Sequence, residues 1–287
     1  MGRNYPRILV CGLTLVMLLS LLAVPVGCGS SGGGGGEAAV MMEKLPKDSE
    51  AFMFMDFAAM RADDGLEELY DGDKEFIESE AWCGVLGISV EDVDRVACGS
   101  SNIHLGISSD NRVMILEGRF DLGEVKAELA GNSYEPDKYK EVETWENGSS
   151  SFGAVALVGD SCIVVGSTIG SARDCIDVIK GDSESLGDDT DSSRVMRRLP
   201  AGLEVSVGTV QTTRGNETTG DVLAKKDSST VRKTTVSLFE DREVADDEME
   251  WVKGQFEEYD NVKVKRDGRF ITVTAEMDIE SYLSYIA

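Results

Sequence analysis

The sequence predicts an α+β protein, with a largely antiparallel sheet, helices packed on one face of it, and an internally duplicated unit. Runs of alternating apolar residues occur in pairs with a short turn between them, most clearly at residues 152–166, and such pairs are typical of antiparallel hairpins. Single amphipathic stretches separate these runs, the longest at residues 243–259. Strand-rich runs interrupted by single helices favour helices on one face of an antiparallel sheet.

The duplication is predicted from the order of the elements. Leu45-Pro46 and Leu199-Pro200 each precede a strand, and each half continues with a further strand, a helix, a hairpin turned by Gly and Asp, and a closing helix. We therefore divide the folded part into units at residues 41–181 and 182–287. Chance similarity between two α+β halves is the alternative.

The first half is predicted from its apolar spacing. Both alternating sets of residues in the first strand are apolar, so we expect that strand to be covered on both faces. The chain is expected to break at Cys83-Gly84, and Asp121 is expected to cap a helix. The predicted elements are a strand at 50–57, helical pieces at 66–70 and 76–77, a hairpin of strands 95–107 and 112–120, a helix at 122–129, an edge strand at 139–145, a hairpin at 152–166 and a helix at 169–179.

The second half follows an acidic linker at residues 181–193. A polar loop rich in Thr, Gly and Lys is expected up to Thr230. The predicted elements are strands at 203–210 and 232–239, a helix at 243–259, a hairpin at 262–277 and a helix at 279–286.

Net charge excludes one class of partner. The chain has 53 Asp and Glu against 28 Lys and Arg, a net charge of −25. Nucleic-acid binding depends on neutralisation of phosphates by Lys and Arg, so we expect no nucleic acid as a partner. An anionic membrane surface is disfavoured for the same reason. The simplest interpretation is a solvated coat that keeps the protein soluble.

The N-terminal segment predicts where the protein is located. Residues 8–26 are apolar, Arg3 and Arg7 precede them, and a Gly/Ser-rich run follows Cys28. These are the features of an export signal, so residues 1–27 are predicted to be a signal peptide or membrane segment and residues 28–40 a flexible linker. Three interpretations stay open: a lipoprotein signal, an uncleaved single-pass anchor, and plain secretion.

Gly27-Cys28 followed by the polar run resembles the lipobox of bacterial lipoproteins, although Pro25 stands where that family usually has an aliphatic residue. The resemblance implies that Cys28 becomes the lipidated N-terminus after cleavage. The stretch beginning at Leu45, LPKDSEAF, is similar to the opening of a group of exported bacterial proteins of unknown function, which implies a fold and an export route.

Four cysteines follow the N-terminal segment. Cys162 would lie about 20 Å from the end of its strand, and Cys175 about 9 Å into the next helix, so this pair is disfavoured. We expect Cys83 and Cys98 to be the better disulfide candidate, with buried thiols as the alternative.

Several chemistries are disfavoured. Gly159-Asp160-Ser161 matches the nucleophile block of certain esterases in three letters, but it lies between two alternating apolar runs and is interpreted as a hairpin turn. His104, the one histidine in the chain, is interpreted as structural. No zinc-ligand spacing occurs. A weak calcium candidate is the acidic set Asp182, Glu184, Asp188, Asp189 and Asp191.

These observations predict a membrane-tethered protein at the extracytoplasmic face of the cell membrane, with a non-catalytic binding or scaffolding domain and no cofactor or metal. Its partners are expected to be the membrane, through a lipid on Cys28 or an N-terminal helix, and an envelope protein or small molecule of unknown identity. The alternatives are a solute-capture protein with a pocket between its halves, and a hydrolase that uses Ser161 or a cysteine.

Overall fold

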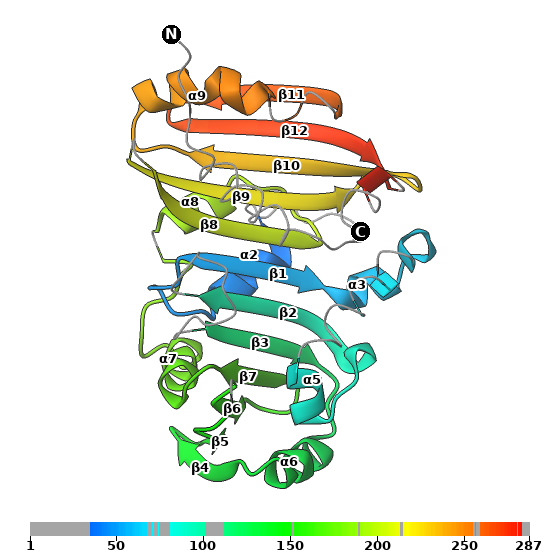
Figure 1. The fold of residues 1–287 in the computed structure, drawn as a ribbon, viewed down its shortest axis with the longest axis vertical. Coiled ribbons are helices and arrows are strands. Elements are labelled where there is room, and N and C mark those ends of the chain that lie inside the picture. Colours follow the sequence, from blue (N-terminus) through cyan, green and yellow to red (C-terminus); the bar gives the residue numbers. More distant parts are fainter. Residues whose placement is uncertain are drawn as a thin grey trace.

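The computed structural model describes residues 35–67, 70–71, 74, 81–100, 112–150, 152–188, 190–212, 215–254, 256, 259–279 and 281–282. Within these residues, twelve strands form one sheet in the order β11-β12-β10-β9-β8-β1-β2-β3-β7-β6-β5-β4 (Figure 1). Every strand pairing is antiparallel. The predicted class, α+β with a large antiparallel sheet, is therefore confirmed.

The strands are β1 Ala51–Asp56, β2 Val93–Ser100, β3 Arg112–Gly118, β4 Glu135–Tyr139, β5 Val142–Glu146, β6 Ala154–Leu157, β7 Cys162–Gly166, β8 Glu204–Thr212, β9 Gly215–Lys225, β10 Thr230–Leu238, β11 Asp260–Asp267 and β12 Phe270–Asp278. The helices are α2 Gly36–Met42, α3 Phe57–Arg61, α5 Ala81–Leu86, α6 Leu122–Gly131, α7 Ile169–Ile179, α8 Asp191–Met196 and α9 Arg242–Gly254. Two 3₁₀ turns, η1 Asp64–Leu66 and η2 Val90–Asp92, complete the described elements.

Strand β1 lies at the centre of the sheet and joins the two halves of the chain. Its residues pair with β2 on one side and with β8 on the other. Phe52 and Phe54 are buried on one face, while Met55 is buried on the opposite face with Met53 packed beside it. The prediction of a strand covered on both faces is confirmed.

Helices cover both faces of the sheet, so the expectation that they pack on one face is wrong. The cluster around Phe54 contains residues of α2, α7 and α8, whereas the cluster around Met55 contains residues of α3, α5 and α6. The reason is the alternation itself. Both sets of side chains in the central strands are apolar, so each face needs cover from water.

Helix α9 covers the far end of the sheet. Ala245 and Val252 of α9 pack against Ile271 and Val273 of β12. Ile271 pairs with Ser237 of β10, so the two side chains point to the same face of the sheet. Val231 of β10 points to that face too, and it belongs to the same hydrophobic cluster as residues of α6. Helices α6 and α9 therefore lie on the same face, at opposite ends of the sheet (Figure 1).

Some segments expected to be irregular are ordered. Residues 36–40, assigned to the Gly/Ser linker from the sequence, belong to α2, because Ala38, Met41 and Met42 bury an apolar face. The acidic linker packs on the first half: Leu186 is buried and its N–H donates to the carbonyl of Leu45 at 2.8 Å. Its last residues form α8, where Thr190 and Ser193 make a capping box.

Two further expectations are wrong. Helix α5 runs through the Cys83-Gly84 pair, because Trp82 and Leu86 are both buried one turn apart. Part of the polar loop expected before Thr230 is the long strand β9, whose β-branched residues pair with β8 and β10. The predicted turn at 108–111 lies outside the described residues.

The packing of β1 predicts a large loss of stability for Phe54→Ala. Phe54 is fully buried in a central strand, so truncation should lower the free energy of unfolding by about 3–5 kcal/mol. The control is Val40→Ala in α2, where the side chain is 50% exposed and the change should stay within about 0.5 kcal/mol. Urea unfolding measures both, and similar values for the two variants would contradict the placement of β1.

Candidate functional site

A cluster of buried polar side chains lies on one face of β8, β9 and β10. Glu204 and Ser206 of β8, Asp221 of β9 and Lys233 of β10 line a cavity of about 10 Å³, and Tyr282 of the C-terminal segment closes it. Alternation places these residues together: Val205 and Val207 point toward α8, so their neighbours Glu204 and Ser206 point to the opposite face. The cluster is the most unusual chemical feature among the described residues, because buried charges are costly.

Lys233 and Asp221 form a buried ion pair. The Nζ of Lys233 lies 3.5 Å from Oδ1 of Asp221, and their side chains are 11% and 7% exposed. Thr235 donates its hydroxyl to the same carboxylate oxygen. Burial is the largest single effect on the pKa of Lys233 and lowers it, but Asp221, Tyr259 and Glu204 together raise it by more, so its pKa is raised overall and the amine is charged.

Glu204 is buried without a comparable partner. Neither carboxylate oxygen has a hydrogen-bond partner among the described residues, and the same holds for the hydroxyl of Ser206. Burial raises the pKa of Glu204 well above its usual value, the charge of Lys233 lowers it, and that of Asp221 raises it further. The folded protein therefore favours the protonated, neutral form of Glu204, because one cation does not compensate two buried carboxylates.

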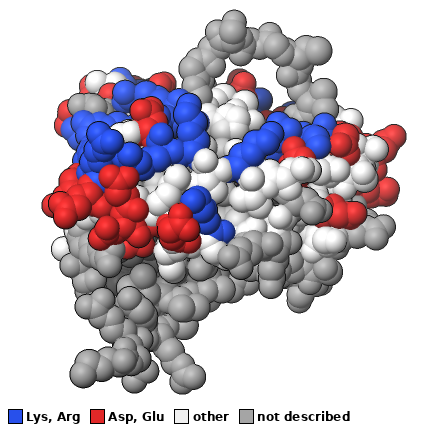
Figure 2. All heavy atoms as spheres, turned by 90° about the horizontal axis from the view of Figure 1, so that it is seen from above, with Lys and Arg blue, Asp and Glu red and all other residues white. Residues whose placement is uncertain are grey.

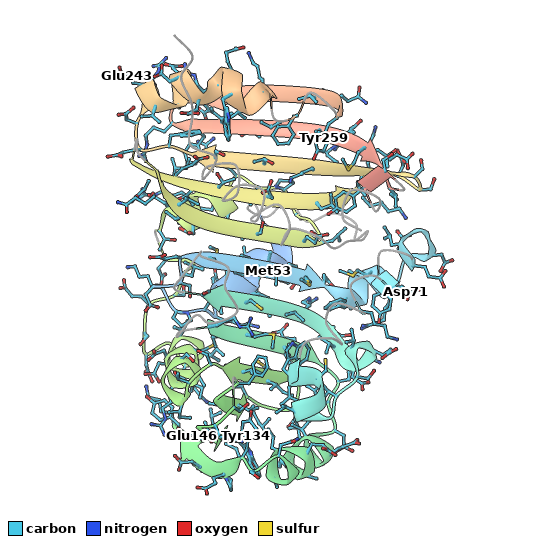
Figure 3. All side chains as sticks on the ribbon, viewed as in Figure 1. Met53, Asp71, Tyr134, Glu146, Glu243 and Tyr259 are labelled. Carbon is cyan, nitrogen blue, oxygen red and sulfur yellow. The ribbon has the colours of Figure 1, made fainter. Side chains whose placement is uncertain are left out.

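The protonation states limit the chemistry of this cluster. A serine nucleophile needs a base beside it that can accept its proton, and the charged Lys233 cannot accept the proton of Ser206. A group of three or more metal-ligating side chains does not occur within the described ranges. The cavity is close to the size of one water molecule and too small for a solute. Figure 3 shows the polar side chains that extend along this part of the sheet, with Tyr259 labelled above it.

The residues that the sequence put forward are not brought together. Cys28, His104 and Asp189 lie outside the described residues. Ser161 lies in the exposed turn between β6 and β7, where Gly159 has a φ of 69° and the carbonyl of Ser161 accepts from Gly118. The hairpin interpretation of this Gly-Asp-Ser sequence is confirmed.

The acidic segment uses its carboxylates on protein partners. Asp182 pairs with Lys140 and Glu184 with Lys47, while Asp188 accepts from the backbone and hydroxyl of Ser185. These carboxylates are turned toward separate partners and do not converge on one point.

Cys83 in α5 and Cys98 in β2 both contribute to the cluster on the α5–α6 face. The structure contains no disulfide between any two of the described cysteines, and the pairing of Cys83 with Cys98 stays a prediction. Cys162 and Cys175 belong to the opposite face, where the thiol of Cys175 donates to the carbonyl of Lys44 at 3.3 Å. Burial raises the pKa of Cys162 to about 11.

Sequence reasoning missed the buried cluster. Glu204 and Lys233 look like solvent-facing members of alternating strands, and Asp221 falls in a segment expected to be a loop. One feature of the sequence could have indicated the cluster: Glu204 and Ser206 interrupt a short apolar strand next to Leu203.

Comparisons with known proteins identify no family for this chain. No protein-family model matches the chain, and no curated protein sequence matches it. A solved structure described as "Structure of crystal form I of TP0453" is similar at a TM-score of 0.49 and 11% sequence identity, over 85% of this chain and 95% of that chain.

The state of Glu204 predicts a pH dependence. A carboxyl with a raised pKa in the folded protein binds its proton more tightly there than in the unfolded chain, so stability falls as pH rises above about 4.5. Glu204→Gln removes this contribution. The free energy of unfolding of the variant, relative to the parent, should therefore rise between pH 4 and pH 8, by about 1.4 kcal/mol for each pH unit by which burial raises the pKa of Glu204.

Urea unfolding across this pH range measures the difference between parent and variant, and any constant offset from the amide cancels. Glu250→Gln is the matched control, since that side chain is 83% exposed. The account of Glu204 is wrong when the two glutamine variants show the same pH profile.

Proposed function

We propose that this chain is a membrane-tethered lipoprotein at the extracytoplasmic face, with lipid on Cys28 and a folded domain that binds or scaffolds another component. The observation that carries the proposal is the N-terminal sequence, an apolar run that ends in Gly27-Cys28 ahead of a Gly/Ser spacer. Gly35, seven residues after Cys28, donates its N–H to the carbonyl of Leu199 at 2.9 Å.

The sequence between Cys28 and Gly35 predicts a short tether, because a flexible Gly/Ser-rich spacer of that length would have an r.m.s. reach of about 13–16 Å. A domain held by such a spacer stays next to the surface that carries the lipid. Within the described residues, no helix is long and apolar enough to cross a membrane.

The rival functions have less support. Solute capture needs a pocket between the halves, but β1 and β8 pair directly there, and the cavity lined by Glu204 is about 10 Å³. For a hydrolase based on Ser161, the Gly159-Asp160-Ser161 sequence is explained by the exposed hairpin turn between β6 and β7 without a nucleophile. A binding or scaffolding role needs neither feature.

We also propose that the two units, residues 41–181 and 182–287, arose by duplication. Each half opens with a short helix, a Leu-Pro pair and a strand: α2, which begins ahead of residue 41, Leu45-Pro46 and β1, then α8, Leu199-Pro200 and β8. This strand is the first of a three-stranded meander, which is followed by a helix on the opposite face and later by a hairpin whose second strand pairs with the last strand of the meander.

The register between β1 and β8 supports the duplication. Phe52 pairs with Val207 and Phe54 with Val205, all on the face covered by α2 and α8. Suppose that Phe52 corresponds to Val205 and Phe54 to Val207. A two-fold axis through the central pair, Met53–Ser206, then maps the Phe52–Val207 pair onto the Phe54–Val205 pair. The first unit then carries two insertions, α3 to η2 and β4 to β5.

Expression in a bacterial host with an alkyne-tagged fatty acid tests the tether. The native chain should incorporate the label and be cleaved before Cys28, because the thiol of Cys28 is the acceptor for lipid. Cys28→Ser should abolish both label and cleavage, and Cys11→Ser, in the same apolar run, should retain both. A native chain that keeps Met1 in its intact mass and takes up no label would contradict the lipoprotein assignment.

A further inference from the structure

One face of β11 and β12 carries basic side chains on an otherwise acidic protein. Lys263 and Lys265 are exposed, and the register places them opposite Thr274 and Thr272. Neither lysine has a carboxylate within ion-pairing distance among the residues that the structure describes. Figure 2, which looks down on this end, shows Lys and Arg in two groups, with Asp and Glu beside them and between them.

The basic face extends inward from the edge strand. Arg232 of β10 and Lys226 both pair with Glu276 of β12. Arg198 pairs with Asp267 and stacks over the ring of Phe270 at 3.9 Å. We call this set the basic face; its members are Arg198, Lys226, Arg232, Lys263 and Lys265, with Asp267, Glu276 and Asp278 as its acids.

Protection of the sheet edge explains part of this pattern. Lysines on an edge strand oppose pairing with other chains, and Lys263 and Lys265 lie on such a strand. However, that role needs no cations on β10 or next to α8, and the basic face reaches both. Five cations against three acids, in a chain of net charge −25, indicate a surface suited to an anionic partner.

The tether emerges on the same face of the sheet. Helices α2 and α8 both pack on the face that carries Thr272 and Thr274, and Gly35 is bonded to Leu199, the neighbour of Arg198. Gly35, the described residue nearest to Cys28 in the sequence, therefore lies next to the basic face. A membrane held by that chain would lie close to these cations.

We propose that the basic face docks on the anionic headgroups of the membrane that holds the tether; the inference rests on the proposed tethering. Net negative charge does not prevent this. At physiological ionic strength the Debye length is about 8 Å, so carboxylates on the far end of the sheet are largely screened, while cations at the surface are not. Juxtamembrane lysines and arginines favour anionic leaflets in this way.

Lysine acylation of the full chain in vesicles tests the docking. The chain is reconstituted in phosphatidylcholine vesicles with and without phosphatidylglycerol, treated briefly with a water-soluble amine-reactive ester, and analysed residue by residue by mass spectrometry. Lys263 and Lys265 should react at least about threefold more slowly with phosphatidylglycerol present, and high salt should remove the difference. Lys138 and Lys180, in the other half, should react equally in both.

Charge reversal separates the tether from the docking. In the native chain phosphatidylglycerol should also slow the acylation of Lys226. The Lys263→Glu/Lys265→Glu variant should still float with vesicles but lose this slowing, whereas the control Lys138→Glu/Lys180→Glu should keep it. A native chain that floats with both vesicles and reacts equally in both overturns the docking alone. A native chain that does not float with either vesicle overturns the tether and the docking together.

Discussion

The pairing of β1 with β8 is the interaction on which the rest of the structure depends. Five consecutive residue pairs join the first half of the chain to the second, from Ala51–Gly208 to Met55–Glu204. Without them, β8 to β12 would have an open edge in the middle of the molecule, where long unpaired strands invite aggregation. With them, one sheet carries both halves, and each face gains a continuous apolar surface for its helices.

Other contacts reinforce this junction. Leu186 bonds to Leu45, Gly35 bonds to Leu199, and Lys225 of β9 pairs with Asp63 at 2.5 Å. Asp63 also accepts from the N–H of Gly65, and the hydrogen bond from Lys225 lowers its pKa. The contacts of Leu45, Leu199 and Lys225 each join a residue of the first half to a residue of the second half. The two halves are therefore bound by backbone pairing, side-chain packing and charge together, and the buried cluster around Glu204 lies next to the same junction.

The sequence predicts the elements whose signals are local. A helix is predicted at residues 169–179 and α7 is found at Ile169–Ile179, because its apolar spacing and the capping residue Thr168 are short-range features. Strand β9 escapes prediction because its residues are polar, and it is a strand only because β8 and β10 pair with it on both sides. The placement of helices on both faces escapes prediction for a related reason: alternation shows which side chains are apolar, but not which distant helix covers them.

The cluster around Glu204 shows the same limit for a site. Its members come from three strands and from Tyr282 near the C-terminus, so their burial is a property of the assembled sheet and not of any local pattern. The proposed N-terminal tether is the opposite case, since the pattern that predicts it is continuous in the sequence and needs no tertiary structure to be recognised.

Native-state hydrogen exchange tests the central position of the β1–β8 junction most directly. If this pairing unites the halves, the amides of β1 and β8 should exchange through the same global opening as those of β3 and β10, with one free energy and one denaturant dependence. If amides of β8 to β12 instead exchange through a separate opening of lower free energy, while β2, β3 and β7 stay protected, the two halves are independent units and the account is contradicted.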